Sequence, residues 1–198
     1  MELLFGTQNQ HKVAEAAAIM SSSEFLLKGL QDFPSFSNLD VEETGTSFEE
    51  NALLKAKTYA ELAGIPTIAD DSGLEVSALD NQPGVYSKRF IPGSDTDRNE
   101  KILSLLNDKH DRSARFVSVI CLYLPKTRKE HFFRGEVAGT IASAIKGTEG
   151  FGYDPIFIPD GYEMTFGELG GSVKNTLSHR ARSLHKLAAF LEDKGNNV

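Results

Sequence analysis

The chain has 198 residues, of which 40% are hydrophobic and 25% are charged, and its net charge is −7 at neutral pH. This length allows one sizeable α/β domain, or two closely packed lobes, with a substantial hydrophobic core. The negative charge disfavours a protein that grips nucleic-acid backbones through a broad basic surface, so any anionic ligand must be held by local cations.

Targeting and membrane signals are missing from the sequence. No basic segment followed by an apolar one stands at Met1, and no apolar run approaches the roughly 18 residues that a membrane span needs. We therefore expect a cytoplasmic protein with neither a membrane nor a nucleic acid as partner. The single cysteine, Cys121 in "RFVSVICLYL", excludes a disulfide framework and indicates a buried structural thiol.

The first elements predict a strand, a turn and a helix. "ELLFG" at 2–6 is typical of a short buried strand, and residues 10–21 of a helix. Thr7, Asn9 and Lys12 lie between or just after them, where backbone N–H groups and the helix dipole favour a phosphate group. No Walker A pattern occurs in the sequence, so this turn does not belong to a P-loop.

The next helix carries the clearest boundary signals. Ser47 and Glu50 form a capping box, and Gly64 predicts its end. The apolar residues of this helix recur every three or four positions: Phe48, Ala52, Ala56, Ala60 and Ala63. Its other face carries Asn51 and Lys55.

A pair of aspartates then follows the short strand "PTIA". We expect this strand to end at Asp70 and Asp71, before Ser72 and Gly73. Asp, Ser and Gly are common turn residues, so the pair can be a solvated strand-ending turn. Alternatively, one carboxylate at the end of a strand in an α/β sheet can bind Mg²⁺ or deprotonate a water molecule.

A second acidic cluster, Glu42 and Glu43, precedes the capped helix. Mg²⁺ typically takes one or two protein carboxylates together with phosphate oxygens and water. Pairing of this cluster with Asp71 is an inference, and a solvated acidic loop is the alternative.

The rest of the chain predicts more strands and two helices. In chain order we expect a helix over 95–106, a strand over 114–125, a turn over 126–130, two short strands over 131–145 broken near Gly139, and a loop over 146–155. A terminal helix opened by "SHR" buries one apolar face: Ala181, Leu184, Leu187, Ala188 and Leu191.

The loop "GFGYDP" places Phe151 and Tyr153 between glycines. These rings can stack on a flat base, which contributes about 1–3 kcal/mol per base, or they can cover a sheet edge by local packing. "SHR" has two readings as well, since Ser178 can simply cap a helix. Several cations stand beside turns or helix starts, and their convergence would suit a triphosphate: Lys55, Lys88, Arg89, Lys174 and Arg180.

Seven segments together resemble the inosine triphosphate pyrophosphatase family, also described as Ham1-like or non-canonical purine NTP pyrophosphatases. In chain order they are "TQNQHK", "VEETGTSFEENALLKA", "ADDSGLEVSAL", "PGVYSKRF", "RSARF", "GFGYDPIF" and "KNTLSHRARSL". They keep the family order and cover nearly the whole chain, so we treat residues 1–198 as one domain of this family.

The resemblance implies a mixed α/β fold of the ITPase-like, anticodon-binding-like type, with a central sheet, flanking helices and two lobes around a nucleotide-binding cleft. It also implies a homodimer that uses Mg²⁺ to hydrolyse ITP, dITP and XTP to the monophosphate and pyrophosphate. Such an enzyme removes deaminated purines from the nucleotide pool.

The resemblance also assigns roles to residues. Asp71 matches the general base, which can also touch the metal; Glu42 matches a metal ligand, and Asp70 supports the site. The residues matched to the phosphates are Thr7, Gln8, Asn9, Gln10, His11, Lys12, Lys55 and Lys88. Those matched to the nucleoside and base are Ser72, Phe151, Gly152, Tyr153, Asp154, Lys174, His179 and Arg180. Donor side chains would select a 6-oxo purine over adenine, which presents an amine at that position.

In the implied reaction Asp71 takes a proton from the attacking water, cations offset the triphosphate charge and Mg²⁺ stabilises the departing pyrophosphate. We hypothesise attack at the alpha phosphate, with the beta phosphate as the open alternative. Two other functions stay open. A Maf-like pyrophosphatase would act on dTTP, UTP or modified nucleotides, and a non-catalytic nucleotide-binding module would bind without turnover, although the presence of Asp71 and Glu42 favours an enzyme.

Overall fold

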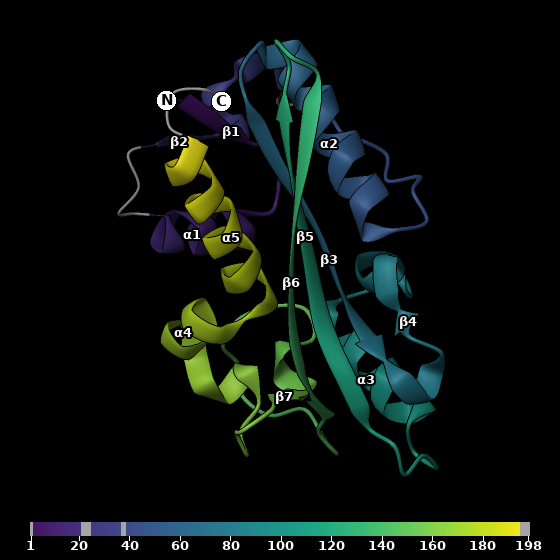
Figure 1. Cartoon of the computed structure of the whole chain (residues 1–198). Coiled ribbons are helices and arrows are strands. Elements are labelled where there is room, and N and C mark those ends of the chain that lie inside the picture. Colours follow the sequence, from purple (N-terminus) through teal and green to yellow (C-terminus); the bar gives the residue numbers. More distant parts are fainter. Residues whose placement is uncertain (1, 21–24, 37–38, 195–198) are drawn as a thin grey trace. The chain divides into compact units, whose positions relative to one another are not determined.

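The computed structural model describes residues 2–20, 25–36 and 39–194 (Figure 1). The strands are β1 (Glu2–Phe5), β2 (Leu26–Gly29), β3 (Thr67–Val76), β4 (Gln82–Pro83), β5 (Ser113–Leu124), β6 (Lys129–Ile141) and β7 (Phe157–Pro159). The α-helices are α1 (Gln10–Ile19), α2 (Phe48–Ala63), α3 (Asp95–Leu105), α4 (Phe166–Leu177) and α5 (His179–Lys194). Short 3-10 helices are η1 (Leu30–Asp32), η2 (Pro34–Phe36), η3 (Ser77–Leu79), η4 (Gly84–Arg89) and η5 (Asp154–Ile156).

The strands form one mixed sheet in the order β2-β1-β3-β5-β6-β7, with β4 paired to β3. β1 runs parallel to both β2 and β3, whereas β4 is antiparallel to β3 and β7 is antiparallel to β6. The expected mixed α/β fold is therefore confirmed. Within the described residues, no helix is long and apolar enough to cross a membrane.

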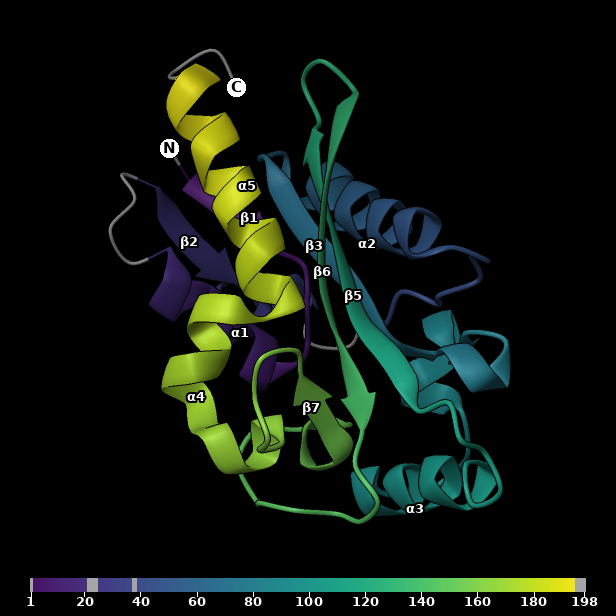
Figure 2. The same cartoon turned by 60° about the horizontal axis from the view of Figure 1, so that its bottom comes forward.

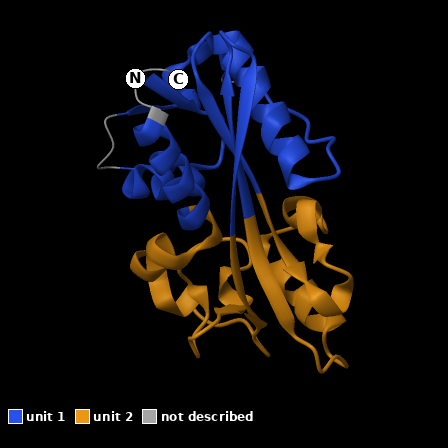
Figure 3. Ribbon diagram, viewed as in Figure 1, with its two compact units in different colours: residues 1–71, 118–135, 181–198 blue, residues 72–117, 136–180 orange. Residues whose placement is uncertain are grey.

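The chain divides into two compact units (Figure 3). Unit 1 comprises Met1–Asp71, Ser118–Gly135 and Ala181–Val198, and unit 2 comprises Ser72–Val117 and Glu136–Arg180. Strands β3, β5 and β6 each contribute residues to both units.

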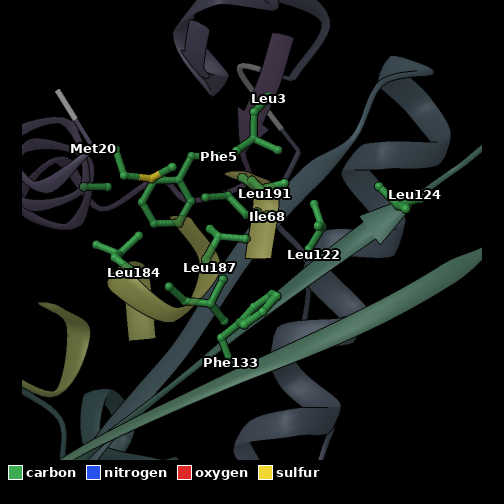
Figure 4. Close-up of a cluster of buried hydrophobic side chains, with 12 residues drawn as sticks. Leu3, Phe5, Met20, Ile68, Leu122, Leu124, Phe133, Leu184, Leu187 and Leu191 are labelled. Atoms are coloured by element: carbon green, nitrogen blue, oxygen red, sulfur yellow. The ribbon is translucent and has the colours of Figure 1, made fainter. Parts of the chain in front are cut away.

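The main core of unit 1 joins α1 and α5 to the strands (Figure 4). Alternate residues of β1 point to opposite faces of the sheet, as strand geometry requires. Leu3 and Phe5 enter the main core, while Leu4 enters a second cluster with Phe36 and Tyr59. The residues of the main core that Figure 4 labels are Leu3, Phe5, Met20, Ile68, Leu122, Leu124, Phe133, Leu184, Leu187 and Leu191.

Unit 2 has its own core, built on the parts of β3, β5 and β6 that belong to this unit and on α3, α4, η5 and β7. Figure 2 shows α3, α4 and β7 near the ends of these strands. Aromatic rings dominate it: Phe116 lies 4.6 Å from Phe157, and Phe157 lies 5.6 Å from Phe166, between ring centroids. Tyr153 of the glycine-bounded loop is part of this core.

The prediction that a strand ends at the aspartates is wrong. β3 continues through Asp70 and Asp71 to Val76, so neither residue lies in a turn. Both carboxylates are buried and have cationic partners, which is the condition under which a strand interior tolerates charge. Gly73 permits the close approach of η4 to β3, because a Cβ there would lie 2.2 Å from the carbonyl oxygen of Gly84.

The expected break near Gly139 is also wrong, because β6 is continuous from Lys129 to Ile141. A Cβ on Gly139 would lie 2.2 Å from the carbonyl oxygen of Ile158 on β7. The glycine therefore permits close approach of a neighbouring strand and does not mark a strand end. β6 also begins inside the segment expected to be a turn, at Lys129.

Several local predictions are confirmed. β1, α3 and β5 lie within a residue or so of their expected bounds, and α2 begins after a Ser47–Glu50 capping box and ends at Gly64 in the left-handed conformation. α1 ends at Ile19, and Ser21 lies outside the described residues.

Cys121 is fully buried, and burial raises the pKa of its thiol to about 12. Strand β2 and helix α4 were not predicted.

Candidate active site

Asp71, the last residue of unit 1, is surrounded by polar groups of α2. The amide of Asn51 donates a hydrogen bond to Asp71 Oδ2 at 3.2 Å, and the Lys55 ammonium lies 3.6 Å from Asp71 Oδ1. Asn51 and Lys55 are one helical turn apart, so both side chains lie on the same face of α2. Asp71 is 5% exposed.

The environment of Asp71 makes it a stronger base than an ordinary aspartate. Burial raises its pKa and the neighbouring Glu43 raises it further, while Lys55, Lys12 and the Asn51 hydrogen bond act in the opposite direction; the net pKa lies above the usual value. A carboxylate with a raised pKa that remains partnered by cations can accept a proton from water.

Lys55 has two carboxylates beside it. It forms an ion pair with Glu43 in addition to its approach to Asp71. Burial by itself would lower the pKa of Lys55, but Asp71, Glu43 and Asp70 together raise it above its usual value. The ammonium is therefore charged at neutral pH and lies next to the candidate base.

Lys12 and Asp70 form a second ion pair in unit 1, with 2.8 Å between Nζ and Oδ1. Lys12 lies in the first turn of α1, whose N-cap is Asn9. Asn9 Oδ1 accepts hydrogen bonds from the backbone N–H groups of His11 and Lys12, and Thr7 Oγ1 accepts one from Asn9 N–H. The expected turn between strand and helix is thus present, with its lysine directed at the first aspartate.

The other residues of this turn face solvent. Gln8, Gln10 and His11 are exposed, and the Gln8 amide donates a hydrogen bond to the Leu39 carbonyl at 2.8 Å. Their roles toward phosphate stay predictions.

The two glutamates ahead of α2 differ in environment. Glu42 is exposed, whereas Glu43 is half-buried and pairs with Lys55. Among the residues that the structure describes, no group of three or more His, Cys, Asp or Glu side chains could hold a metal ion by itself. The carboxylate oxygens near Asp71 are hard donors of the kind that Mg²⁺ prefers, and one or two of them suffice when phosphate oxygens complete the shell.

In unit 2, the loop after residue 150 is tied to α4. Asp154 Oδ2 accepts hydrogen bonds from the Lys174 ammonium at 2.6 Å and from the Phe151 backbone N–H at 2.8 Å. The Lys174 ammonium also lies 4.2 Å from the centre of the Phe151 ring, and the Arg180 guanidinium lies 5.6 Å from it. The structure therefore brings four of the sequence-predicted base-reading residues together.

The two aromatic residues of the loop have separate environments. Tyr153 is buried and donates a hydrogen bond to the Ser87 carbonyl at 2.8 Å, and burial raises the pKa of its phenol so that it remains a donor. Phe151 is only half-buried. Local packing therefore accounts for Tyr153, and the ring with surface left to offer a ligand is Phe151.

The segment "SHR" joins α4 to α5: Ser178 lies between the helices, and His179 and Arg180 are the first residues of α5. Ser178 has an extended backbone, and His179 stacks on Phe116 with ring centroids 4.7 Å apart. Arg180 is 1% exposed and donates a hydrogen bond to Ser72 Oγ at 2.9 Å. The sequence-predicted residues Ser72 and Arg180 thus contact each other, whereas Lys88 on η4 is exposed and its proposed phosphate contact stays a prediction.

Three site features escaped the sequence reasoning. Asn51 was noted only as a neighbour of Lys55, and its i, i+4 spacing from that lysine was the available signal. Glu43, and not Glu42, pairs with Lys55. The contacts of α3 with Gly152 had no sequence signal beyond the Ser94 cap that starts the helix.

Comparison with known proteins gives consistent matches over the full length. The "dITP/XTP pyrophosphatase" of Symbiobacterium thermophilum is 45% identical over 199 residues, covering 96% of this chain and 97% of that protein. A protein of the same description from Acholeplasma laidlawii is 42% identical, covering 98% and 94%.

Solved structures agree with the sequence matches. The Ham1 protein of Staphylococcus aureus superposes with a TM-score of 0.88 at 38% identity, covering 98% of this chain and all of that one. A HAM1 protein from Coxiella burnetii gives a TM-score of 0.88 at 37% identity, covering 98% and 99%. The Ham1 family profile matches residues 3–190, and the chain belongs to the Ham1 family.

Proposed function

We propose that this chain is a nucleoside-triphosphate pyrophosphatase that hydrolyses ITP, dITP and XTP to the monophosphate and pyrophosphate, and so removes deaminated purines from the nucleotide pool. Relatives at 41–45% identity that carry the description dITP/XTP pyrophosphatase support this substrate class. The strands shared by both units support the expectation that residues 1–198 act as one domain.

The observation that carries the proposal is the setting of Asp71. A buried carboxylate whose pKa is raised, oriented by the Asn51 amide and flanked by the Lys55 ammonium, has the properties of a general base for water attack. Burial outweighs the neighbouring cations in setting this pKa, whereas a carboxylate in a solvated ion pair would have its pKa lowered by its partner.

The cations of unit 1 bind the phosphates. Lys12 and Lys55 are each paired with carboxylates, and a triphosphate offers them stronger acceptors with more negative charge. The backbone N–H groups and side chains of the Thr7–Lys12 turn, at the start of α1, add further donors. These interactions neutralise charge that builds up on the departing pyrophosphate.

A divalent metal ion, which we propose to be Mg²⁺, takes part in this site. Asp71 would hold it together with Glu42 of the acidic segment, and the substrate phosphates would complete its oxygen shell. When bound, the ion supplies Lewis-acid stabilisation of negative charge on the phosphate oxygens.

Unit 2 recognises the base. The half-buried Phe151 ring offers a stacking surface, and Lys174 and Arg180 are donors beside it; we expect His179 to be a further donor to the base. A 6-oxo purine accepts a hydrogen bond where adenine offers an amine, so an array of donors favours hypoxanthine and xanthine. We also propose a homodimer, as the family resemblance implies, which sedimentation of the native chain would test.

The test is pyrophosphate release with Mg²⁺ from ITP, dITP, XTP, GTP, ATP and dTTP, comparing the native chain with Asp71→Asn. We expect ITP, dITP and XTP to be favoured by about tenfold or more, equivalent to about 1.4 kcal/mol, and Asp71→Asn to lower the rate of release by roughly 10²–10⁴. Preference for dTTP would indicate a different nucleotide pyrophosphatase, and binding without turnover a non-catalytic module.

Hydrolysis in ¹⁸O water tests the point of attack. Attack at the alpha phosphate leaves the label in the monophosphate. Label in pyrophosphate would show attack at the beta phosphate and would require a different position for the water relative to Asp71.

A further inference from the structure

Two side chains of α3 hold the loop that carries Phe151. They bind the backbone N–H and the carbonyl group of one loop residue, Gly152. Asp95 Oδ2 accepts a hydrogen bond from the Gly152 N–H at 2.7 Å, and the Asn99 amide donates one to the Gly152 carbonyl at 3.0 Å. Asp95 and Asn99, named here the α3 pair, lie one helical turn apart and so face the same side of α3.

Asp95 is itself oriented from its own helix. The Arg98 guanidinium bonds to Asp95 Oδ1 at 2.5 Å and to the Gly93 carbonyl at 2.8 Å. One oxygen of Asp95 is therefore engaged by Arg98 and the other by Gly152. These two contacts hold the Asp95 carboxylate in position against the loop.

Asn99 is hard to explain by the stability of α3. It is 2% exposed, and its Oδ1 atom has no hydrogen-bond partner in the described part of the chain. A buried polar atom left without a partner is unfavourable by about 1–3 kcal/mol, whereas a leucine of similar volume would avoid this loss. Within the described residues, the contact that uses the amide group of Asn99 is the hydrogen bond to Gly152.

Gly152 separates the two aromatic residues of the loop, so fixing its peptide groups constrains both. Its φ of +64° is in the left-handed region that favours glycine. On one side Tyr153 is anchored in the unit 2 core through its hydroxyl, and on the other Phe151 packs beneath the Lys174 ammonium. The α3 pair therefore acts together with Asp154, which holds the Phe151 N–H and the Lys174 ammonium, in fixing where the Phe151 ring lies.

We propose that Asp95 and Asn99 are positioning residues that set the base selectivity of this site by fixing the loop of Phe151 through Gly152. The inference rests on the proposed function. Neither residue touches the substrate; each acts through the placement of the stacking ring and of the donor above it.

The experiment compares kcat and KM for dITP and dATP in the native chain and in Asn99→Leu, Asp95→Ala and Asp95→Asn, alongside thermal unfolding. In Asn99→Leu and Asp95→Ala we expect the dITP:dATP ratio of kcat/KM to fall roughly three- to tenfold, the size of one hydrogen bond, through KM for dITP. Asn99→Leu should lose selectivity and yet keep the native melting temperature. If Asn99 had a purely structural role, lost selectivity would be accompanied by a lower melting temperature. Asp95→Asn retains an acceptor for Gly152 N–H and should restore the ratio.

Asp97→Ala is the matched control. Asp97 lies on the same first turn of α3 and completes its capping box with Ser94, whose backbone N–H and hydroxyl donate hydrogen bonds to the Asp97 carboxylate. It should lower the stability of the helix and leave the ratio unchanged. Unchanged ratios in Asn99→Leu and Asp95→Ala, or an equal loss in Asp97→Ala, would overturn the inference. A native chain that does not prefer dITP over dATP would instead contradict the proposed function.

Discussion

The two units hold their cations in different ways. In unit 1 the side chains of Lys12 and Lys55 remain 14% and 12% exposed, although those of their partners Asp70 and Asp71 are only 0% and 7% exposed. In unit 2 the paired side chains of Lys174 and Asp154 are only 4% and 2% exposed. A cation still in contact with water can exchange a carboxylate for a phosphate, whereas opening a fully buried pair leaves an uncompensated charge. We expect from this difference that the lysines of unit 1 change partners when the proposed substrate binds, while unit 2 keeps a fixed geometry for recognition.

The largest effect expected from this division is in unit 1. Asp71→Asn keeps the volume and the polarity of the side chain but removes the proton acceptor, so kcat/KM should fall by roughly 10²–10⁴. Because the base does not contact the purine in our proposal, dITP and dATP should lose activity equally. The measurement is the dITP:dATP ratio at high enzyme concentration. A ratio that shifts with Asp71→Asn would mean that chemistry and recognition are not divided between the units.

The buried pair of unit 2 should behave in the opposite manner. Lys174→Met leaves the Asp154 carboxylate buried without its cation, which destabilises the native state by about 3–5 kcal/mol. The loop should also lose selectivity, because Asp154 accepts the Phe151 backbone N–H as well. Urea unfolding gives the stability, and the dITP:dATP ratio gives the selectivity.

The double variant Lys174→Met with Asp154→Asn is the control for this second effect. It removes both charges, so it should be more stable than Lys174→Met by itself while selectivity stays low. A double variant as unstable as the single one would show that lost packing of the lysine side chain, and not an unpaired charge, causes the instability.

Two buried helix asparagines give a closer comparison. Asn51 of α2 donates to Asp71 and accepts from Gly45 N–H at 2.8 Å, whereas Asn99 of α3 donates to Gly152. Asn51→Ala frees the candidate base from its amide, and we expect kcat to fall by roughly 10- to 100-fold, a loss typical of misplacement by an ångström or less. The dITP:dATP ratio should not change. Steady-state kinetics on both substrates therefore distinguishes Asn51→Ala from Asn99→Leu. A changed dITP:dATP ratio with normal kcat in Asn51→Ala would contradict the assignment of chemistry to unit 1 and recognition to unit 2.

The elements predicted correctly from sequence have signals that are local. Ser47 and Glu50 report the start of α2 within four residues, and Gly64 reports its end. The apolar run around Cys121 is long enough to indicate β5 without reference to a partner. In each case a few adjacent residues determine the element.

The failures concern residues whose conformation depends on distant partners. Asp70 and Asp71 resemble turn residues until Lys12 and Lys55 are placed beside them, and Gly139 resembles a strand break until Ile158 is placed against it. The same holds for the site. Asp71 and the turn before α1 could be predicted from residue type and family resemblance, but the contacts of Asn51 and of the α3 pair exist only in three dimensions.

The smallest expected effect concerns a feature that both units share. Glu50 in unit 1 and Asp97 in unit 2 close equivalent capping boxes. Hydrogen bonds from Thr46 and Ser47 hold the pKa of Glu50 below its usual value. Hydrogen bonds from Ser94 do the same for the pKa of Asp97. A pKa that is lower in the folded state means that folding favours the ionised form. The resulting stability is present above the pKa of the unfolded chain and is lost as pH falls through the folded pKa.

Glu50→Gln and Asp97→Asn should therefore lower the melting temperature slightly at pH 7, and the difference from the native chain should shrink below about pH 4, the usual range of these carboxyls. Thermal unfolding at a series of pH values checks this. Since the boxes only start α2 and α3, the two variants should respond to pH alike and keep the native dITP:dATP ratio. A loss of ratio in Glu50→Gln would be informative, because it would show that the start of α2 contributes to base recognition and that the two units do not divide the work as proposed.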